Sequence, residues 1–495
     1  MRIGLLTESG YPCAGGDTGL WCDRLVRGLG QHEFDIYALS RGRRREDNGR
    51  LPIPPQVRRV RTARLRTAGD DGAPLGRRAR KRFAEHYGEL LGAVCGTQAG
   101  STAELADRFG NALYNLAERA RDTGALTGAL RSDHAVSALE RACRAPGAPR
   151  TAREARVPDL LAVTGHPARA LRPLSLDRYG DGALGAVDLC HATSGGSAAL
   201  PGLLARHFSG VPPLVTEYGV QLRAHYLALG PGTAAPAVRA LLAAFHGRLA
   251  TEFYRRAELL TPGSSHARRR QERCGADRAR IRTVRPGMDA ARYLARCRAP
   301  AARLFPDEAE GPQAAGDNPV TFTEVGAPEA PTPPDAYAAG AVVVLSSVVE
   351  GLPVSPAEAM FCGRAAVSTA VGAVVEVVGG TGLVVPPRNP RALAEVCGAL
   401  LRDPERRARL GAAGRARALE LFGVEQNIAA FHGIYLEIMS RCPARGGAVG
   451  DIGGPLPFAV AAEAHVPGHR TMPTARTPLR GRGSPAPVRA TEGTR

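Results

Sequence analysis

Lysine is almost absent from this chain of 495 residues, since Lys81 is the only one among 65 basic residues. No G-K-[ST] sequence occurs, which excludes a P-loop nucleoside triphosphatase. The net charge of +18 comes from arginine, and part of the excess lies in residues 441–495. Only 5% of the residues are aromatic, so few side chains could stack on bases. We expect no specific nucleic-acid partner; an arginine-rich nucleic-acid binder that uses this tail is the alternative.

Long apolar runs and paired cysteines are also missing. The longest apolar runs, Ala240–Phe245 and Ala341–Leu345, are far shorter than the roughly 20 residues that span a bilayer. The first ten residues hold too few apolar side chains for the core of a signal peptide. None of the ten cysteines forms a C-x-x-C pair, which argues against structural zinc. We therefore expect a cytoplasmic protein with reduced thiols and at most peripheral contact with a membrane.

What the chain does contain is an alternation of short apolar strands and amphipathic helices. Residues 2–8 predict a strand, a glycine-containing loop follows, and apolar residues at helical spacing precede a second strand at Phe34–Leu39. This order is the opening unit of a doubly wound α/β domain. Residues 41–185 lose the alternation and predict a mostly helical insertion. The alternation then resumes and continues to a strand at Ile281–Val284.

The length suggests two or three domains, and the pattern divides the chain into four parts. Residues 1–289 form the first Rossmann-like domain with its insertion. Residues 290–318 contain no strand candidate and predict a linker. Residues 319–440 form a second α/β domain, beginning with a strand at Val320–Thr323, and its last helix, Val424–Ser440, is expected to cross back to the first domain. Residues 441–495, rich in Arg, Pro and Gly, predict a disordered tail.

Two segments are candidates for binding a ligand at the ends of strands. Gly15 and Gly16 follow the first strand, where a glycine loop lets the backbone approach an anion at a helix N-terminus. The alternative is a simple turn. Glu350 and Glu358 follow a buried strand, and carboxylates at the carboxyl edge of a parallel sheet suit sugar hydroxyls. For Glu358 a structural alternative exists, because Ser355 could cap a helix in a capping box that Glu358 completes.

Two further strands end in polar residues. His191 closes the strand AVDLCHA beside the loop Thr193–Gly196, where it could bind a substrate or accept a proton. A satisfied structural histidine is an equal alternative. Glu217-Tyr218-Gly219 closes the strand PLVT and leaves the same choice between a site and a loop. If two α/β lobes face each other with these edges, the four segments enclose one cleft.

The chain resembles a retaining glycosyltransferase of the GT-B fold, glycosyltransferase family 4 (the group 1 glycosyl transferases). The N-terminal half is similar to the PelF-like subgroup in LLTESGYPCAGGDTGLWCDRLVRGL, in HATSGGSAAL with GVPPLVTEYGV, and in VRPGMD. In the C-terminal half the similar segment runs from YAAGAVVVLSSVVEGLPVSPAEAMF to GTGLVVPPRNP, followed by LLRDPERRARLG. The E-x7-E spacing from Glu350 to Glu358, between a strand and a helix, carries most of this resemblance.

The resemblance implies two Rossmann-like lobes and transfer of a sugar, with retention of configuration, from a nucleotide diphosphate sugar such as UDP-glucose. It implies no cofactor and no metal ion, and it leaves the acceptor open as a glycan, a lipid or a small molecule. Glu350 and His191 are implied as catalytic residues, His191 on the acceptor side. The implied donor-binding residues are Gly15, Gly16, Gly351, Leu352, Pro353 and Glu358.

The sequence departs from this family at its cationic motif. The G-R-x-x-x-x-K stretch that neutralises the leaving diphosphate is missing, and no lysine follows Lys81. Tyr218 stands where the family has the histidine of T-E-H-G. The C-terminal lobe also lacks about its first two strand–helix units. The alternative to an active transferase is therefore a degenerate GT-B relative that binds a nucleotide sugar or a partner without catalysis.

Overall fold

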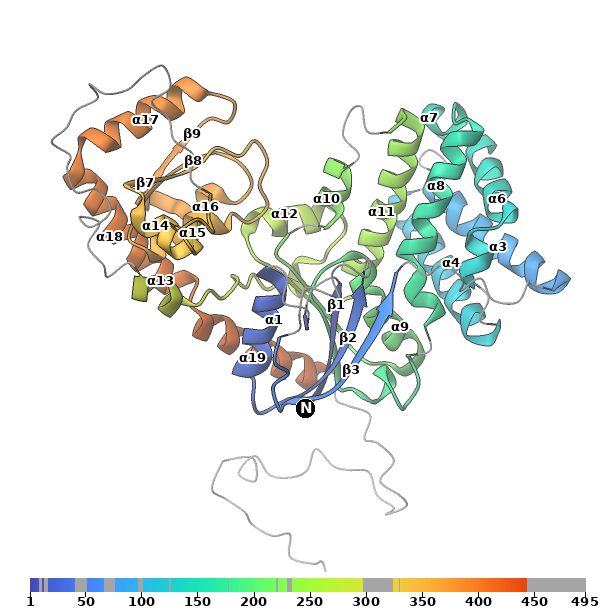
Figure 1. Cartoon of the computed structure of the whole chain (residues 1–495). Helices are drawn as coiled ribbons and strands as arrows, with labels where there is room; N and C mark the ends of the chain where they lie inside the picture. Colours follow the sequence, from blue (N-terminus) through green and yellow to red (C-terminus); the bar gives the residue numbers. More distant parts are fainter. Residues whose placement is uncertain are drawn as a thin grey trace, which may run out of the picture. The chain divides into compact units, whose positions relative to one another are not determined.

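The described residues form two parallel β-sheets, each flanked by helices (Figure 1). The computed structural model describes residues 1–8, 11–12, 17–40, 51–65, 76–96, 101–123, 126–176, 178–219, 221–228, 234–296, 324–328 and 330–442. These residues belong to one compact unit. Among them, no helix is both long and apolar enough to cross a membrane.

The first sheet has six strands, all parallel, in the order β3-β2-β1-β4-β5-β6. They are β1 (Arg2–Glu8), β2 (Glu33–Ser40), β3 (Val57–Arg64), β4 (Leu189–Ala192), β5 (Pro213–Glu217) and β6 (Leu259–Pro262). This is the doubly wound order, whose topological switch point lies between β1 and β4. The predicted fold class is therefore confirmed for the N-terminal half. The predicted strand at Ile281–Val284 is wrong, because only Ile281 forms a bridge, to Leu260.

Strand β3 lies inside the segment that we predicted to be mostly helical, and this part of the prediction is wrong. Its arginines, including Arg58 and Arg59, obscure the period of two, yet β3 pairs with β2 from Val57 to Arg64, with one register shift at Arg58. It is one of the two edge strands of the sheet and is only partly buried. Charged side chains are common on edge strands, where they oppose pairing with another chain.

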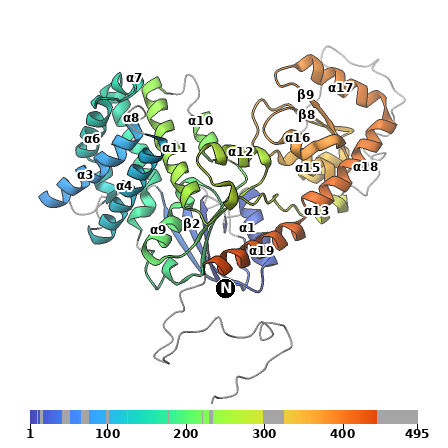
Figure 2. The same ribbon diagram turned by 180° about the vertical axis from the view of Figure 1, so that it is seen from behind.

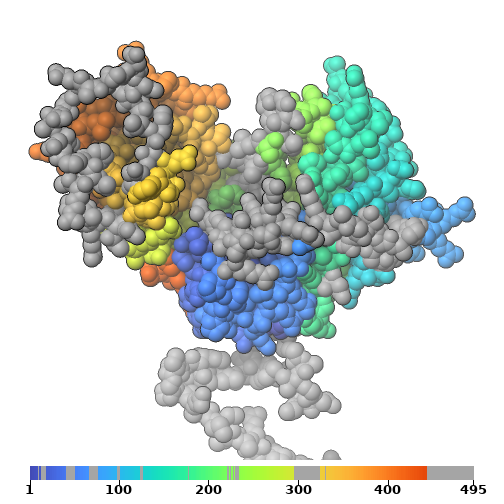
Figure 3. All heavy atoms as spheres, viewed as in Figure 1, coloured from blue at the N-terminus to red at the C-terminus, as the bar shows by residue number. Residues whose placement is uncertain are grey.

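The rest of the insertion is helical, as predicted. Its helices are α3 (Arg77–Cys95), α4 (Thr102–Thr123), α5 (Leu126–Leu130), α6 (Asp133–Arg144), α7 (Arg150–Arg153) and α8 (Val157–Ala170). Figures 1 and 2 show them gathered beside α11 (Pro236–Arg256), and Figure 3 shows their light-blue to teal atoms together at the right of the view. Phe109 of α4 and Phe245 of α11 are fully buried between these helices, with ring centroids 6.2 Å apart.

The other helices of the first sheet are α1 (Asp17–Gly28), α9 (Leu200–Ser209), α10 (Gln221–Ala228) and α12 (Ser265–Arg273). A short 3₁₀ helix, η3 (Gly196–Ala198), follows β4. The second sheet has, within the described residues, the strands β7 (Val342–Leu345), β8 (Ala365–Thr369) and β9 (Leu383–Val385), all parallel. Its helices are α14 (Pro333–Ala339), α15 (Val354–Phe361), α16 (Val374–Val378), α17 (Pro390–Arg402) and α18 (Pro404–Leu421). The strand predicted at Val320–Thr323 lies outside the described residues, as does the tail beyond Cys442.

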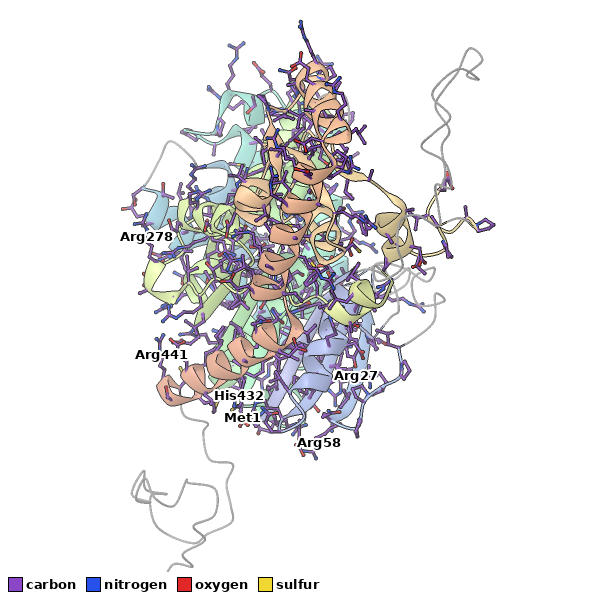
Figure 4. The ribbon with its side chains drawn as sticks, turned by 90° about the vertical axis from the view of Figure 1, so that its left-hand side faces the viewer. Met1, Arg27, Arg58, Arg278, His432 and Arg441 are labelled. Atoms are coloured by element: carbon purple, nitrogen blue, oxygen red, sulfur yellow. The ribbon has the colours of Figure 1, made fainter. Side chains whose placement is uncertain are left out.

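The predicted linker begins with a helix instead, α13 (Ala290–Arg296). Tyr293 of α13 is buried and stacks on Phe361 of α15, with ring centroids 5.9 Å apart. The last helix, α19 (Val424–Arg441), crosses back to the first sheet, as predicted. Its buried side chains Phe431, Tyr435 and Ile438 join the core of β1, β2 and α1. Figure 4 shows α19, labelled at His432 and Arg441, running beside α1, labelled at Arg27.

Candidate functional site

A cavity of about 330 Å³ is lined by residues from the start of α1 and from the start of α15. Its walls come from α1, the loop after β5, residues 286–289, α13 and the loop that enters α15. The lining side chains that we discuss below are Trp21, Arg24, Tyr218, Arg292, Tyr293 and Glu358. Gly351 and Leu352 also line it, so three of the predicted donor-binding residues share this cavity. Gly15 and Gly16 lie outside the described residues, although Thr18, two residues after Gly16, lines the cavity.

Glu358 does not complete a capping box, and that structural alternative is wrong. Helix α15 begins at Val354 with Pro353 as its N-cap, and no side-chain hydrogen bond caps it. Glu358 therefore lies a full turn inside the helix, where its carboxylate accepts hydrogen bonds from two tyrosine hydroxyls. Tyr293 Oη donates to Oε1, and Tyr337 Oη donates to Oε2 over 2.8 Å. Burial and the adjacent carboxylate raise the pKa of both tyrosines, which keeps them protonated and able to donate.

Glu350 lies in a loop that hydrogen bonds hold in place. Ser347 Oγ donates to Glu350 Oε1 over 2.7 Å, and Thr369 Oγ1 donates to the Ser347 carbonyl over 2.5 Å. Gly372, at φ +59°, approaches so closely that an added Cβ would lie 2.3 Å from the Glu350 carbonyl oxygen. The Glu350 side chain is partly exposed and does not line the cavity, and neither does Pro353. This loop is thus preorganised next to the cavity.

The structure corrects the expected position of His191. The side chain is fully buried beneath α19 rather than exposed in a cleft. Its Nδ1 lies 2.7 Å from Tyr435 Oη and its Nε2 lies 2.7 Å from Thr216 Oγ1, so both ring nitrogens are occupied. Burial lowers the pKa of His191 to about 3, and the ring is neutral at neutral pH. These contacts agree with the alternative of a structural histidine whose hydrogen bonds are satisfied. A catalytic role for His191 stays a prediction.

Asn427, which sequence reasoning missed, connects several walls of the cavity. Trp21 Nε1 donates to Asn427 Oδ1 over 3.0 Å. Asn427 Nδ2 donates to Tyr218 Oη over 3.1 Å and to the Arg285 carbonyl over 2.6 Å. Trp21 and Tyr218 also meet edge to face, with centroids 5.1 Å apart. In the sequence, Trp21 could have been singled out because it is the one tryptophan of the chain. Nothing in the sequence marked Asn427, which lies 406 residues away on α19.

Glu217, the other residue of the segment that closes β5, points away from this cavity. Its carboxylate is buried and accepts hydrogen bonds from Tyr254 Oη over 2.7 Å and from Gln271 Nε2 over 3.1 Å. Glu217 therefore joins β5 to α11 and α12. Of the three residues in that segment, Glu217 therefore has a structural role, whereas Tyr218 and Gly219 line the cavity.

Two arginines supply positive charge to the cavity. Arg24 comes from α1 and Arg292 from α13, and the Arg292 guanidinium carbon lies 6.0 Å from the centroid of the Tyr293 ring. Asp289 is nearby on the wall, but its Oδ1 accepts the backbone N–H of Ala291 over 3.1 Å at the start of α13. Arginine binds phosphate oxygens through a planar fork of N–H donors. Nowhere in the described ranges do three His, Cys, Asp or Glu side chains gather to hold a metal ion.

The two lobes and the returning helix α19 form a GT-B fold, and the cavity lies beside the E-x7-E segment. Residues 300–403 match the family described as "Glycosyl transferases group 1". Residues 1–279 match the family described as "Domain of unknown function (DUF3492)", and the chain belongs to that family.

Known proteins resemble parts of the chain. A D-inositol 3-phosphate glycosyltransferase of Xylanimonas cellulosilytica is 42% identical over 113 residues, which are 22% of this chain and 27% of that protein. The lipopolysaccharide core biosynthesis mannosyltransferase LpsB of Rhizobium meliloti is 34% identical over 110 residues, 21% of this chain and 31% of LpsB. These matches thus span about a third or less of each relative. Sucrose-phosphate synthase of Thermosynechococcus elongatus shares the fold over 89% of this chain and 99% of its own, with 16% identity and a TM-score of 0.50.

Proposed function

We propose that this protein is a retaining glycosyltransferase that moves a sugar from a nucleotide diphosphate sugar, such as UDP-glucose, to an acceptor. The observation that carries the proposal is the placement of Glu358, Gly351 and Leu352 in one cavity with Arg24 and Arg292. The group 1 glycosyl transferase match over residues 300–403 includes the E-x7-E segment and supports the same reading. Retention rests on the family resemblance.

In this proposal Glu358 binds the ribose of the donor nucleotide. An ionised carboxylate offers about four lone-pair sites, so it can accept ribose hydroxyls while it keeps its tyrosine partners. Tyr293 and Tyr337 then orient the carboxylate toward the nucleotide. Gly351, Leu352 and Pro353 lie along the donor sugar, and Glu350 bonds its hydroxyls near the anomeric carbon. Gly15 and Gly16 approach the diphosphate.

Arg24 and Arg292 take over the charge of the missing G-R-x-x-x-x-K motif in this proposal. Negative charge develops on the leaving nucleoside diphosphate, and preorganised cations in a cavity stabilise it without a metal ion. The guanidinium groups come from α1 and α13, so a bound donor would contact both lobes. His191 acts from the core, where it positions α19 against β4 rather than touching substrate.

A screen of nucleotide sugars, beginning with UDP-glucose, tests the proposal through calorimetric binding and release of the nucleoside diphosphate. Arg292→Gln should bind UDP-glucose at least about tenfold more weakly and slow turnover, as loss of a charge-assisted contact predicts. Arg402→Gln, which changes an exposed arginine on α17, is the matched control and should behave like the parent. Binding without turnover would identify the degenerate, non-enzymatic relative, and no binding of any nucleotide sugar would refute the proposal.

A further inference from the structure

A second cavity, of about 430 Å³, lies in the N-terminal lobe and has no part in the proposed donor site. Its polar walls come from Glu8 at the end of β1, from α8, from η3 after β4, from α10 and from α11. The volume is within the roughly 300–1,000 Å³ of small-molecule sites. In this sheet β1 and β4 flank the topological switch point, and open α/β sheets bind ligands outside the carboxyl ends of the strands at that point.

Among the described residues, three histidines and one arginine line this cavity. His166 and Arg169 lie one turn apart on α8, His225 comes from α10 and His246 from α11. The rings of His225 and His246 stack with centroids 3.6 Å apart and planes 10° apart. His246 is buried, with 8% of its surface exposed. Burial, together with the nearby His225 and His166, lowers the pKa of His246 to about 3.

Such a cluster suits an anion better than a neutral sugar. A neutral imidazole offers one N–H donor and an imidazolium offers two, while the guanidinium is a permanent fork of donors. Among the described residues of the wall, Glu8 supplies a carboxylate, which can accept hydrogen bonds from the hydroxyl groups of a sugar ring. Ser197 adds a hydroxyl beside Gly196, and Leu65 and Leu249 close apolar parts of the wall. The cavity therefore combines a guanidinium and imidazole N–H donors for an acidic substituent with a carboxylate for hydroxyls.

We propose that this cavity binds a sugar-sized anion, a hexose bearing a phosphate or carboxylate group, and that this molecule is the acceptor of the transfer. The second half rests on the proposed function, whereas the binding site itself does not. Arg169, His166, His225 and His246 hold the acidic group, and Glu8 holds ring hydroxyls.

Calorimetry on the full chain without any donor tests the site. The probes are glucose 6-phosphate, glucuronate and, for comparison, glucose. We expect one of the two anions to bind at least roughly tenfold more tightly than glucose, and which one it is identifies the acidic group. Arg169→Gln and His225→Phe should each weaken that binding roughly tenfold or more; the phenylalanine keeps the stack on His246 but has no N–H. Arg248→Gln on α11, which changes a half-buried arginine outside the cavity, should bind as the parent does.

The pH dependence gives a second readout. A bound anion favours protonated imidazole, so the affinity should increase from about one pH unit above the ordinary histidine pKa to about one unit below it. His246 stays neutral through this range, because burial lowers its pKa to about 3; the other titratable or charged groups described at the site are His166, His225, Arg169 and Glu8. Equal binding of glucose and both anions, or unchanged binding in both cavity variants, would overturn the inference.

The same samples separate this inference from the proposed function. Anion binding that depends on Arg169, in a protein that transfers nothing from UDP-glucose, would keep the site and refute the transferase. Transfer from UDP-glucose to neutral acceptors, with no binding of either anion, would refute the site and keep the transferase.

Discussion

Tyr337 on α14 donates a 2.8 Å hydrogen bond to Glu358 on α15, and this bond decides how the second glutamate of the E-x7-E segment is presented. Together with Tyr293 of α13, it holds the carboxylate at the wall of the cavity instead of at the helix terminus. Helices α13 and α14 thus contribute to the candidate donor site through tyrosines that lie outside the E-x7-E segment.

Glu358→Gln should weaken UDP binding about tenfold or more, because an amide accepts fewer hydrogen bonds from ribose and tyrosine hydroxyls than a carboxylate does. Calorimetry with UDP checks this. Glu405→Gln, at an exposed position of α18, is the matched control and should leave UDP binding unchanged. UDP affinity equal to the parent in Glu358→Gln would remove Glu358 from the donor site.

Glu350→Gln should abolish or strongly reduce transfer while the melting temperature stays within about a degree of the parent. Glu350 is partly exposed, and the amide oxygen can still accept the bond from Ser347 that now reaches Oε1. Surface changes of this kind shift stability by only about 0.5 kcal/mol. A transfer assay and a thermal melt on the same sample decide it. Full activity with a normal melt would show that Glu350 has no role in the reaction.

Asn427→Leu should destabilise the protein by about 1–3 kcal/mol and also weaken donor binding. The substitution leaves the indole N–H of Trp21 and the hydroxyl of Tyr218 without this partner in a buried position. Both rings line the donor cavity, so their displacement changes its shape. Urea unfolding and UDP calorimetry measure the two effects, with the exposed Glu425→Gln as control. A loss of stability with unchanged UDP affinity would limit Asn427 to a structural role.

Acidification should destabilise the protein through His191. Its pKa is about 3 in the folded state and about 6.5 in an unfolded chain, so below about pH 6.5 the unfolded state binds the extra proton. Stability should therefore fall as the pH decreases from about 6.5 toward 3, by up to about 1.4 kcal/mol per pH unit from this group. Urea unfolding across this range measures the slope.

His191→Leu should make that slope shallower and, at neutral pH, cost about 1–3 kcal/mol, because the hydroxyl of Tyr435 loses its buried partner. The exposed His134→Gln should change neither quantity. An unchanged slope in His191→Leu would show that the acid sensitivity comes from other groups, such as His246 and His32, whose pKa values burial also lowers.

The amino-acid sequence by itself determined the α/β class, most of the strands and the helix at α19, because hydrophobic periodicity is a local property that survives in a single sequence. It also located the glutamate segment, since a strand, a loop and a helix follow one another there within a few residues. It failed at β3, where arginines on an edge strand hide the alternation, and at α13, whose alanines and arginines resemble those of a linker.

Only the tertiary structure decided what each polar side chain contacts. His191 and Glu350 look alike in sequence, since each lies at or just after the carboxyl end of a predicted strand. Packing of α19 buries the histidine, whereas the glutamate is partly exposed. Glu358 meets Tyr293 across 65 residues, and Trp21 meets Asn427 across 406. Local patterns carry no information about such partners, because burial and hydrogen bonding depend on which elements pack together. The second cavity, lined by His166, His225 and His246, likewise forms because α8, α10 and α11 meet at the ends of β1 and β4.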